Sequence, residues 1–192
     1  NRTSLLHASE VVSSLLESVI DGASHPLQLN KIEGDAVLLY AELGDDAQAG
    51  ASDVLRQASS MFAAFHARAR LLSGERAACP CDACRNILAL RLKIVVHHGR
   101  VAFRRIRQFE EMTGEDVIVV HRLLKNTIAA EEYLLLTEAF HQLAGAAPEM
   151  TMQASAEYYD DLGPIATRVH FPRQLAAGTV GSDRAVPHAT NR

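Results

Sequence analysis

The chain has 192 residues, of which 48% are hydrophobic and 22% charged, and its formal net charge is −4. This length suits one domain with tails, or at most two small domains, and a chain of this size folds without needing disulfides or a metal. The composition excludes a disordered or fibrous chain. Because no apolar run approaches about 18 residues, we expect neither a membrane-spanning helix nor a membrane partner.

Two helices and a hairpin are predicted in the first 75 residues. Residues 5–21 carry apolar side chains at helical spacing, and Gly22 is a plausible stop. Residues 27–32 and 36–42 are β-like runs on either side of a Glu-Gly-Asp turn, which predicts a hairpin. Residues 51–73 form the clearest helix because one apolar stripe runs along them: Val54, Leu55, Ala58, Met61, Phe62, Phe65, Ala69 and Leu72.

The second half of the chain mixes strands with shorter helices. In chain order we predict strands at 87–98 and 100–106, a helix at 115–126, a strand at 132–137, a helix at 138–143, and an antiparallel pair at 150–160 and 165–171. Residues 1–172 then form one domain, and residues 173–192 read as a disordered tail because they have few apolar anchors. This order predicts an α+β fold, with helices packed on a mostly antiparallel sheet.

Positive charge is concentrated between residues 83 and 109. This stretch holds seven basic and no acidic residues, whereas the rest of the chain holds 12 basic and 23 acidic residues. Such a segment attracts phosphate-bearing ligands, although a solvated strand face with acidic neighbours has the same composition. Because the chain is not basic overall and only 5% of its residues are aromatic, we expect no nucleic-acid partner.

All three cysteines lie in the loop Cys79-Pro-Cys-Asp-Ala-Cys84. An odd number packed so closely is a poor disulfide framework and indicates a reducing, cytoplasmic location. Cys79, Cys81 and Cys84 could supply three of the four ligands that zinc prefers. The alternative is a Pro-containing turn with free thiols. Spacing alone does not decide which histidine would be the fourth ligand, and three are candidates: His66, His97 and His98.

Three motifs occur in the order found in class III nucleotide cyclases. They are Lys31-Ile-Glu-Gly-Asp-Ala36, Ile94-Val-Val-His-His-Gly-Arg-Val101 and Gly114-Glu-Asp-Val-Ile-Val-Val-His-Arg-Leu123, followed by the strand Tyr133-Leu-Leu-Leu-Thr137. Over residues 5–171 the chain therefore resembles this family. The cysteine loop and a D-V-I-x-x-H-R-L-L-K-N motif also resemble an uncharacterised bacterial family of cyclase-like domains. The resemblance implies a ferredoxin-like nucleotide cyclase fold and a homodimer with its sites between two subunits.

The same resemblance implies roles for individual residues. Asp35 matches an aspartate that holds Mg²⁺ or Mn²⁺, and Arg122 matches an arginine that stabilises charge on the α-phosphate of a nucleoside triphosphate. Lys31 and Glu111 match the pair that recognises adenine, and His97 matches a mainly structural histidine. Simpler interpretations are a turn residue for Asp35, and surface ion pairs for Arg122 and for Lys31 with Glu111.

Other positions depart from the family pattern. The first metal aspartate and its strand would lie before Asn1, Ile118 replaces the asparagine that orients the ribose, and the closing hairpin offers only Arg168 where cyclases have a lysine. We therefore expect a cyclase fold without its first strand, in a non-catalytic or degenerate domain that binds a nucleotide or dimerises. The alternative is an active cyclase that makes cyclic AMP from ATP, if the native N-terminus supplies the missing aspartate.

Overall fold

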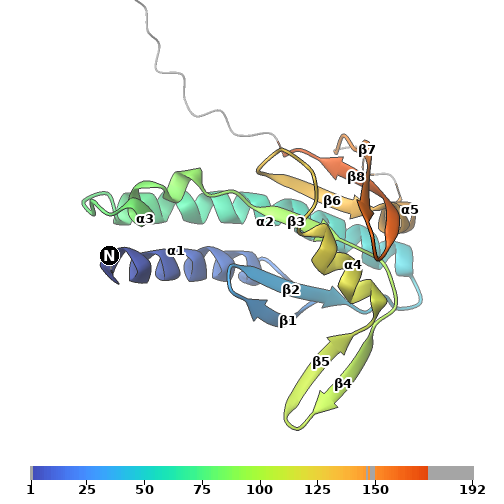
Figure 1. The fold of residues 1–192 in the computed structure, drawn as a ribbon. Coiled ribbons are helices and arrows are strands. Elements are labelled where there is room, and N and C mark those ends of the chain that lie inside the picture. Colours follow the sequence, from blue (N-terminus) through green and yellow to red (C-terminus); the bar gives the residue numbers. More distant parts are fainter. Residues whose placement is uncertain (1, 146, 148–149, 173–192) are drawn as a thin grey trace, which may run out of the picture.

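Two long helices, α1 (Arg2–Asp21) and α2 (Ala47–Glu75), lie side by side (Figure 1). The computed structural model describes residues 2–145, 147 and 150–172, so the tail expected at 173–192 lies outside the described residues. The side chain of Asp46 caps α2 by accepting a hydrogen bond from the Ala49 amide at 2.9 Å. The two helices share a buried apolar cluster, which includes Val11, Leu15 and Val19 of α1 and Met61, Phe65, Ala69 and Leu72 of α2.

Three sheets are present in the described part of the chain. The strands β1 (Leu27–Glu33) and β2 (Ala36–Ala41) form an antiparallel hairpin, as predicted. A second hairpin consists of β4 (Ala102–Ile106) and β5 (Phe109–Thr113), and it projects away from the helices (Figure 1). The main sheet has the strand order β3-β6-β8-β7, with bounds Lys93–Val96, Tyr133–Thr137, Gly163–His170 and Gln153–Tyr159. In it β3 and β6 are parallel, and the other pairs are antiparallel.

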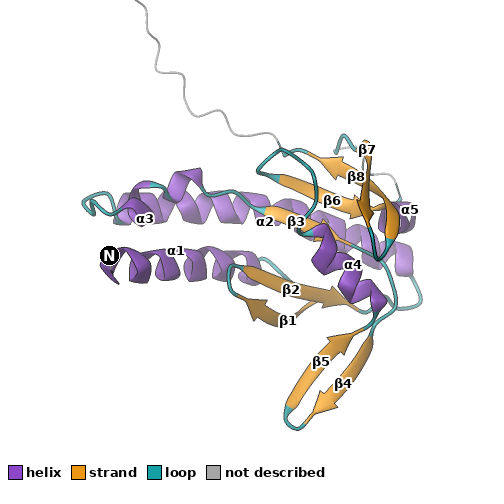
Figure 2. Cartoon of the chain, viewed as in Figure 1, coloured by secondary structure: helices purple, strands orange, loops and turns teal. Residues whose placement is uncertain are grey.

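Helices cover both faces of the main sheet (Figure 2). Leu134 and Leu136 of β6 pack with residues of α2 and of α5 (Glu138–Ala144). Tyr133 and Leu135 point the other way and pack with Leu123 of α4 (Glu115–Leu123). This two-sided burial explains why β6 is an uninterrupted apolar run rather than an alternating one. The predicted α+β class, with helices on a largely antiparallel sheet, is confirmed.

The segment before β3 differs from the prediction. Instead of one strand over 87–98, the chain forms the short helix α3 (Asp82–Arg85) and a 3-10 turn (Ile87–Ala89) before β3 begins at Lys93. Ile87 is fully buried against α1 and α2, so its apolar character serves helix packing rather than a strand. A short apolar run does not by itself distinguish these two environments.

The strand β5 was not predicted at all. Its hairpin turn contains Arg107, which adopts a φ of 57°, so no glycine marks the turn in the sequence. None of the helices in the described part of the chain is both long and apolar enough to cross a membrane.

Candidate functional site

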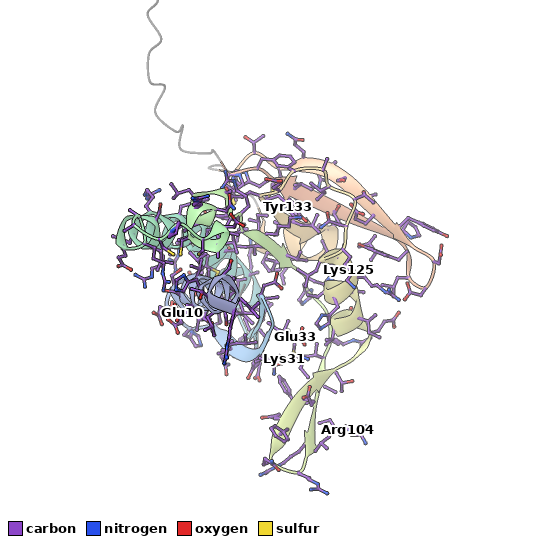
Figure 3. All side chains as sticks on the ribbon, turned by 60° about the vertical axis from the view of Figure 1, so that its left-hand side comes forward. Glu10, Lys31, Glu33, Arg104, Lys125 and Tyr133 are labelled. Atoms are coloured by element: carbon purple, nitrogen blue, oxygen red, sulfur yellow. The ribbon has the colours of Figure 1, made fainter. Side chains whose placement is uncertain are left out.

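Lys31 on β1 is the centre of a network of charged side chains. Its Nζ lies 2.7 Å from Glu33 Oε1 and 3.8 Å from Glu111 Oε2 of β5. Figure 3 shows Lys31 and Glu33 close together on the hairpin. The hydrogen bond between them raises the pKa of Lys31 and lowers the pKa of Glu33 from their ordinary values. The structure thus brings Lys31 and Glu111 together, but the ammonium group is already shared between two carboxylates.

Asp35 lies exposed in the turn between β1 and β2, where Gly34 adopts a φ of 64°. A magnesium or manganese centre of the cyclase type needs carboxylate oxygens from more than one side chain. In the described part of the chain, Asp35 does not belong to the one group of three or more His, Cys, Asp or Glu side chains whose ligand atoms converge. Asp35 thus occupies an exposed turn position outside that group.

Arg122 on α4 is paired with a carboxylate from the closing hairpin. Its Nη2 and Nε donate to the same oxygen of Asp161, Oδ2, at 2.6 and 3.1 Å. The Tyr159 hydroxyl donates to the Arg122 carbonyl at 2.9 Å. These residues lie around a depression of about 350 Å³ that is lined by Arg122, Tyr158, Tyr159, Asp160 and Asp161. The arginine expected to meet a phosphate is thus paired with Asp161, and a second aspartate, Asp160, lines the same depression.

Two further positions, Ile118 and Arg168, also depart from the cyclase pattern. Ile118 is 50% exposed on α4 and offers no hydrogen-bonding group where a ribose would be oriented. Arg168 on β8 donates to both carboxylate oxygens of Glu138, at 2.7 and 3.3 Å, and does not line the depression at Arg122. The only cation of the closing hairpin region is therefore engaged by Glu138.

The basic segment is spread over several elements rather than gathered at Arg122. Arg104 and Arg105 on β4 stand opposite Glu111 and Glu110 of β5, and Figure 3 shows Arg104 out on this hairpin. Lys93 lies over the ring of Tyr133, 5.4 Å from its centre. None of the seven basic residues lines the depression at Arg122. The geometry favours solvated basic residues with acidic neighbours over a phosphate cradle.

His97 ties the end of β3 to α4 and β6. Its Nε2 lies 2.9 Å from Asp116 Oδ1, and its Nδ1 lies 2.9 Å from Thr137 Oγ1. The Arg100 amide donates to Asp116 Oδ2 at 2.6 Å, and a Cβ on Gly99 would lie 2.2 Å from Asp116 Cγ. Burial raises the pKa of Asp116, but the hydrogen bonds from His97 and the Arg100 amide outweigh it, so the pKa is below its ordinary value. These contacts give His97 a structural position.

The three histidines considered as a fourth zinc ligand are not beside the cysteines. His97 is bound to Asp116, and His66 Nε2 lies 2.9 and 3.0 Å from the carboxylate oxygens of the buried Glu132. His98 is exposed and does not belong to the cysteine cluster. The expectation was wrong because it favoured histidines that lie near the loop in the sequence or on the adjoining helix.

The imidazole beside the cysteines is that of His7, more than 70 residues earlier on α1. Its Nδ1 lies 3.4 Å from Cys79 Sγ, 3.5 Å from Cys81 Sγ and 3.5 Å from Cys84 Sγ. The four ligand atoms all lie within 4.8 Å of one another, so the group could hold a metal ion. The Cys84 amide and His7 lower the pKa of Cys81 to about 6, whereas burial raises the pKa of Cys84 to about 11.

Local structure explains why these four side chains meet. His7 precedes the buried residues Val11, Leu15 and Val19 at steps of four, so it lies on the face of α1 that meets α2. After α2 ends, the chain turns back, and α3 begins directly after Cys81 and carries Cys84 into the core. This four-residue spacing predicts from the sequence that His7 lies on the buried face of α1, but it does not connect His7 with the cysteine loop.

Comparison with known proteins shows the family to which this chain belongs. The model of the family described as "Protein of unknown function (DUF2652)" matches residues 12–133, more than half of the chain. The chain belongs to this family. It is also 35% identical over 131 residues to "Uncharacterized protein Rv2561/Rv2562" of Mycobacterium tuberculosis (strain ATCC 25618 / H37Rv); the match takes in 68% of this chain and 59% of that relative, so the chain spans about three fifths of the relative's length.

Solved structures of nucleotide cyclases share the fold of this DUF2652 member. The guanylyl cyclase Cya2 is similar with a TM-score of 0.60 and 10% identity, over 88% of this chain and 81% of that one. A bacterial light-regulated adenylyl cyclase has a TM-score of 0.55 and 12% identity, over 88% and 46% of the two chains. The adenylyl cyclase CyaB from P. aeruginosa has a TM-score of 0.55 and 12% identity, over 93% and 87%. At this identity the likeness establishes a cyclase-like fold.

Proposed function

We propose that this chain is a degenerate nucleotide cyclase domain that does not catalyse cyclisation and acts by pairing with a second copy of itself. The observation that carries the proposal is the pairing of Arg122 with Asp161. An arginine that stabilises a phosphate in a transition state must present its guanidinium to the incoming anion. Here a carboxylate of the same chain already occupies that guanidinium, in a depression that contains a second aspartate.

The other positions that correspond to catalytic residues of cyclases support the same conclusion. Asp35 is an exposed turn residue outside the one group of three or more converging ligand side chains in the described part of the chain, and Ile118 has no group that could orient a ribose. The Lys31–Glu111 pair, which could recognise adenine, is the feature that favours nucleotide affinity. Since the guanidinium of Arg122 is already paired with Asp161, we expect at most weak binding of a nucleoside triphosphate and no turnover.

The homodimer part of the proposal rests on the projecting hairpin of β4 and β5. It exposes the apolar side chains of Phe103, Ile106 and Phe109. Because a two-stranded hairpin alone is only marginally stable, burial of these side chains against a partner would stabilise it. The Phe103 ring contacts Tyr40 of β2, with ring centres 5.1 Å apart, and so anchors the base of the hairpin. A second copy of the chain would cover the exposed apolar side chains, as the cyclase resemblance implies.

An active cyclase is the second candidate, and Lys31 with Glu111 is the observation that favours it. The two candidates differ in one measurement. The product of the whole native gene is incubated with ATP and Mn²⁺, and cyclic AMP is quantified. We expect no cyclic AMP above the background of an Arg122→Ala variant; formation of cyclic AMP that this substitution abolishes would establish the second candidate.

A further inference from the structure

We propose that His7, Cys79, Cys81 and Cys84 form a closed tetrahedral site for a structural Zn²⁺ ion. The distances are those that a shared central ion imposes. With bonds of about 2.3 Å to sulfur and about 2.0 Å to nitrogen, the sulfur–nitrogen edge of a tetrahedron is about 3.5 Å and the sulfur–sulfur edge about 3.8 Å. The three Sγ atoms lie 3.4, 3.5 and 3.5 Å from His7 Nδ1, and Cys79 Sγ lies 3.5 Å from Cys81 Sγ.

Hydrogen bonding between thiols and imidazole does not account for this arrangement. The Nδ1 atom of a neutral imidazole carries either one proton or one lone pair, so it satisfies one thiol well, not three at once. A disulfide does not account for it either, since bonded sulfurs lie about 2.05 Å apart, and all three cysteines are free. One nitrogen equidistant from three sulfurs therefore indicates a common centre that all four atoms face.

The ligand set indicates both the metal and its role. Soft thiolates with one imidazole favour zinc over magnesium or manganese, and three cysteines with one histidine are a common structural zinc set. All four positions come from the protein, which leaves none open for water or a substrate. This ligand set also differs from that of Asp35, whose carboxylate oxygen suits a hard cation such as Mg²⁺.

The surroundings suit a site that carries negative charge. Zinc with three thiolates and a neutral imidazole has a net charge of −1, which a nearby cation stabilises. Arg76, at the end of α2, contacts Cys84 and pairs with Glu10 of α1 at 2.8 Å, and both contacts raise the pKa of Arg76. Figure 3 shows Glu10 on α1. The guanidinium thus joins the cysteine region to the same stretch of α1 that carries His7.

Zinc in this position would fasten the start of α1 to the end of α2 and to α3. The first side chain of α1 in the buried cluster is Val11, while Leu5 and Leu6 are exposed by 73% and 56%. The turns before Val11 therefore gain little from apolar burial. An ion held by His7 and the cysteine loop would hold these turns in place, and Figure 1 shows α3 at the end of the molecule where α1 begins.

The test is metal analysis of the full chain, produced without a histidine tag and kept reduced. We expect one zinc per chain by inductively coupled plasma mass spectrometry, and loss of most of that zinc in both His7→Ala and Cys81→Ser. The exposed His98→Ala is the matched control and should retain the full amount. Zinc that persists in His7→Ala would overturn the four-ligand assignment. Iron in place of zinc would overturn the identification of the metal as zinc.

A measurement on the unaltered chain covers the case in which the variants do not fold. The metal-free protein, prepared with a chelator, is titrated with Co²⁺, which reports thiolate ligation by an intense charge-transfer band in the near ultraviolet. We expect the band to saturate at one equivalent, to disappear when Zn²⁺ is added, and three thiols to lose reactivity towards a thiol reagent on zinc binding. Absence of the band, with three thiols equally reactive with and without zinc, would refute the site.

Discussion

Arg122 of α4 and Asp161 of the β7–β8 turn are held together by two hydrogen bonds from one guanidinium to one carboxylate oxygen, at 2.6 and 3.1 Å. Both side chains are about half exposed, so the pair adds at most about 1 kcal/mol to the stability of the fold. Its larger consequence concerns ligands, because a phosphate that approached Arg122 would have to displace an anion that is tethered in place. The pairing gives a physical reason why a cyclase-like fold need not be a cyclase.

Removing the carboxylate should expose Arg122 to anions. We expect Asp161→Asn to increase the affinity for inorganic pyrophosphate about 1.4- to fivefold, which corresponds to the roughly 0.2–1 kcal/mol of an exposed ion pair. Isothermal titration calorimetry at low salt measures this change. Asp160→Asn removes the same charge from the same depression without touching the ion pair, so an equal gain in both variants would show that Asp161 has no specific effect.

Gly99 should tolerate no side chain. A Cβ at this position would lie 2.2 Å from Asp116 Cγ, and Asp116 is held by His97 and by the Arg100 amide, so it cannot move away without losing hydrogen bonds. We expect Gly99→Ala to lower the free energy of unfolding by about 1–3 kcal/mol in urea denaturation.

Gly74→Ala is the matched control for that substitution. Gly74 lies in α2, and a Cβ added there would meet no atom within 4 Å, so alanine should be neutral or should stabilise the helix by up to about 1 kcal/mol. Equal effects of the two substitutions would contradict the close approach of Gly99 to Asp116.

Stability should depend on pH through Asp116. Its pKa in the folded protein is below the ordinary value of 3.8, so its contribution is fully present above that value and is lost as the pH falls through the lower folded pKa. We expect Asp116→Asn to be less stable than the unaltered protein at pH 7, and the difference to shrink at pH 3. A difference that stayed constant between the two pH values, measured by urea unfolding, would show that ionised Asp116 makes no net contribution.

The projecting hairpin should control self-association. Phe109 is 60% exposed on β5, and a dimer that buries it should be weakened when a charge is placed there. We expect Phe109→Asp to be a monomer at concentrations where the unaltered chain sediments as a dimer in analytical ultracentrifugation. Leu71→Asp places the same charge at an equally exposed position on α2 and should leave the dimer intact. A monomeric unaltered chain, or a dimer that is insensitive to Phe109→Asp, would refute this interface.

The parts of the fold that were predicted correctly are those specified by local patterns. The hairpin at Gly34, the apolar stripe of α2 and the closing antiparallel pair each follow from neighbouring residues. The strand β5 was missed because its turn uses Arg107 rather than a glycine. The stretch around Ile87 was misassigned because burial against two helices produces the same apolar run as a strand.

The candidate sites show the same division between local and distant information. The cysteines were identified from their spacing, but His7 contacts them across more than 70 residues, and no local pattern connects the two segments. Likewise, the cyclase motifs showed that a lysine was missing from the closing hairpin, but not that Asp161 reaches Arg122. Only the packing of α1 on α2, and of α4 near the β7–β8 turn, supplies those two contacts.

Measuring cyclic AMP tests most directly whether the paired Arg122 belongs to a domain without cyclase activity. The whole native protein and its Arg122→Ala variant are compared with ATP and Mn²⁺ at saturating concentrations, using mass spectrometry to detect the product. We predict equal amounts in both, at the level of the enzyme-free reaction. Cyclic AMP produced by the unaltered protein and lost in the variant would contradict the proposed loss of activity.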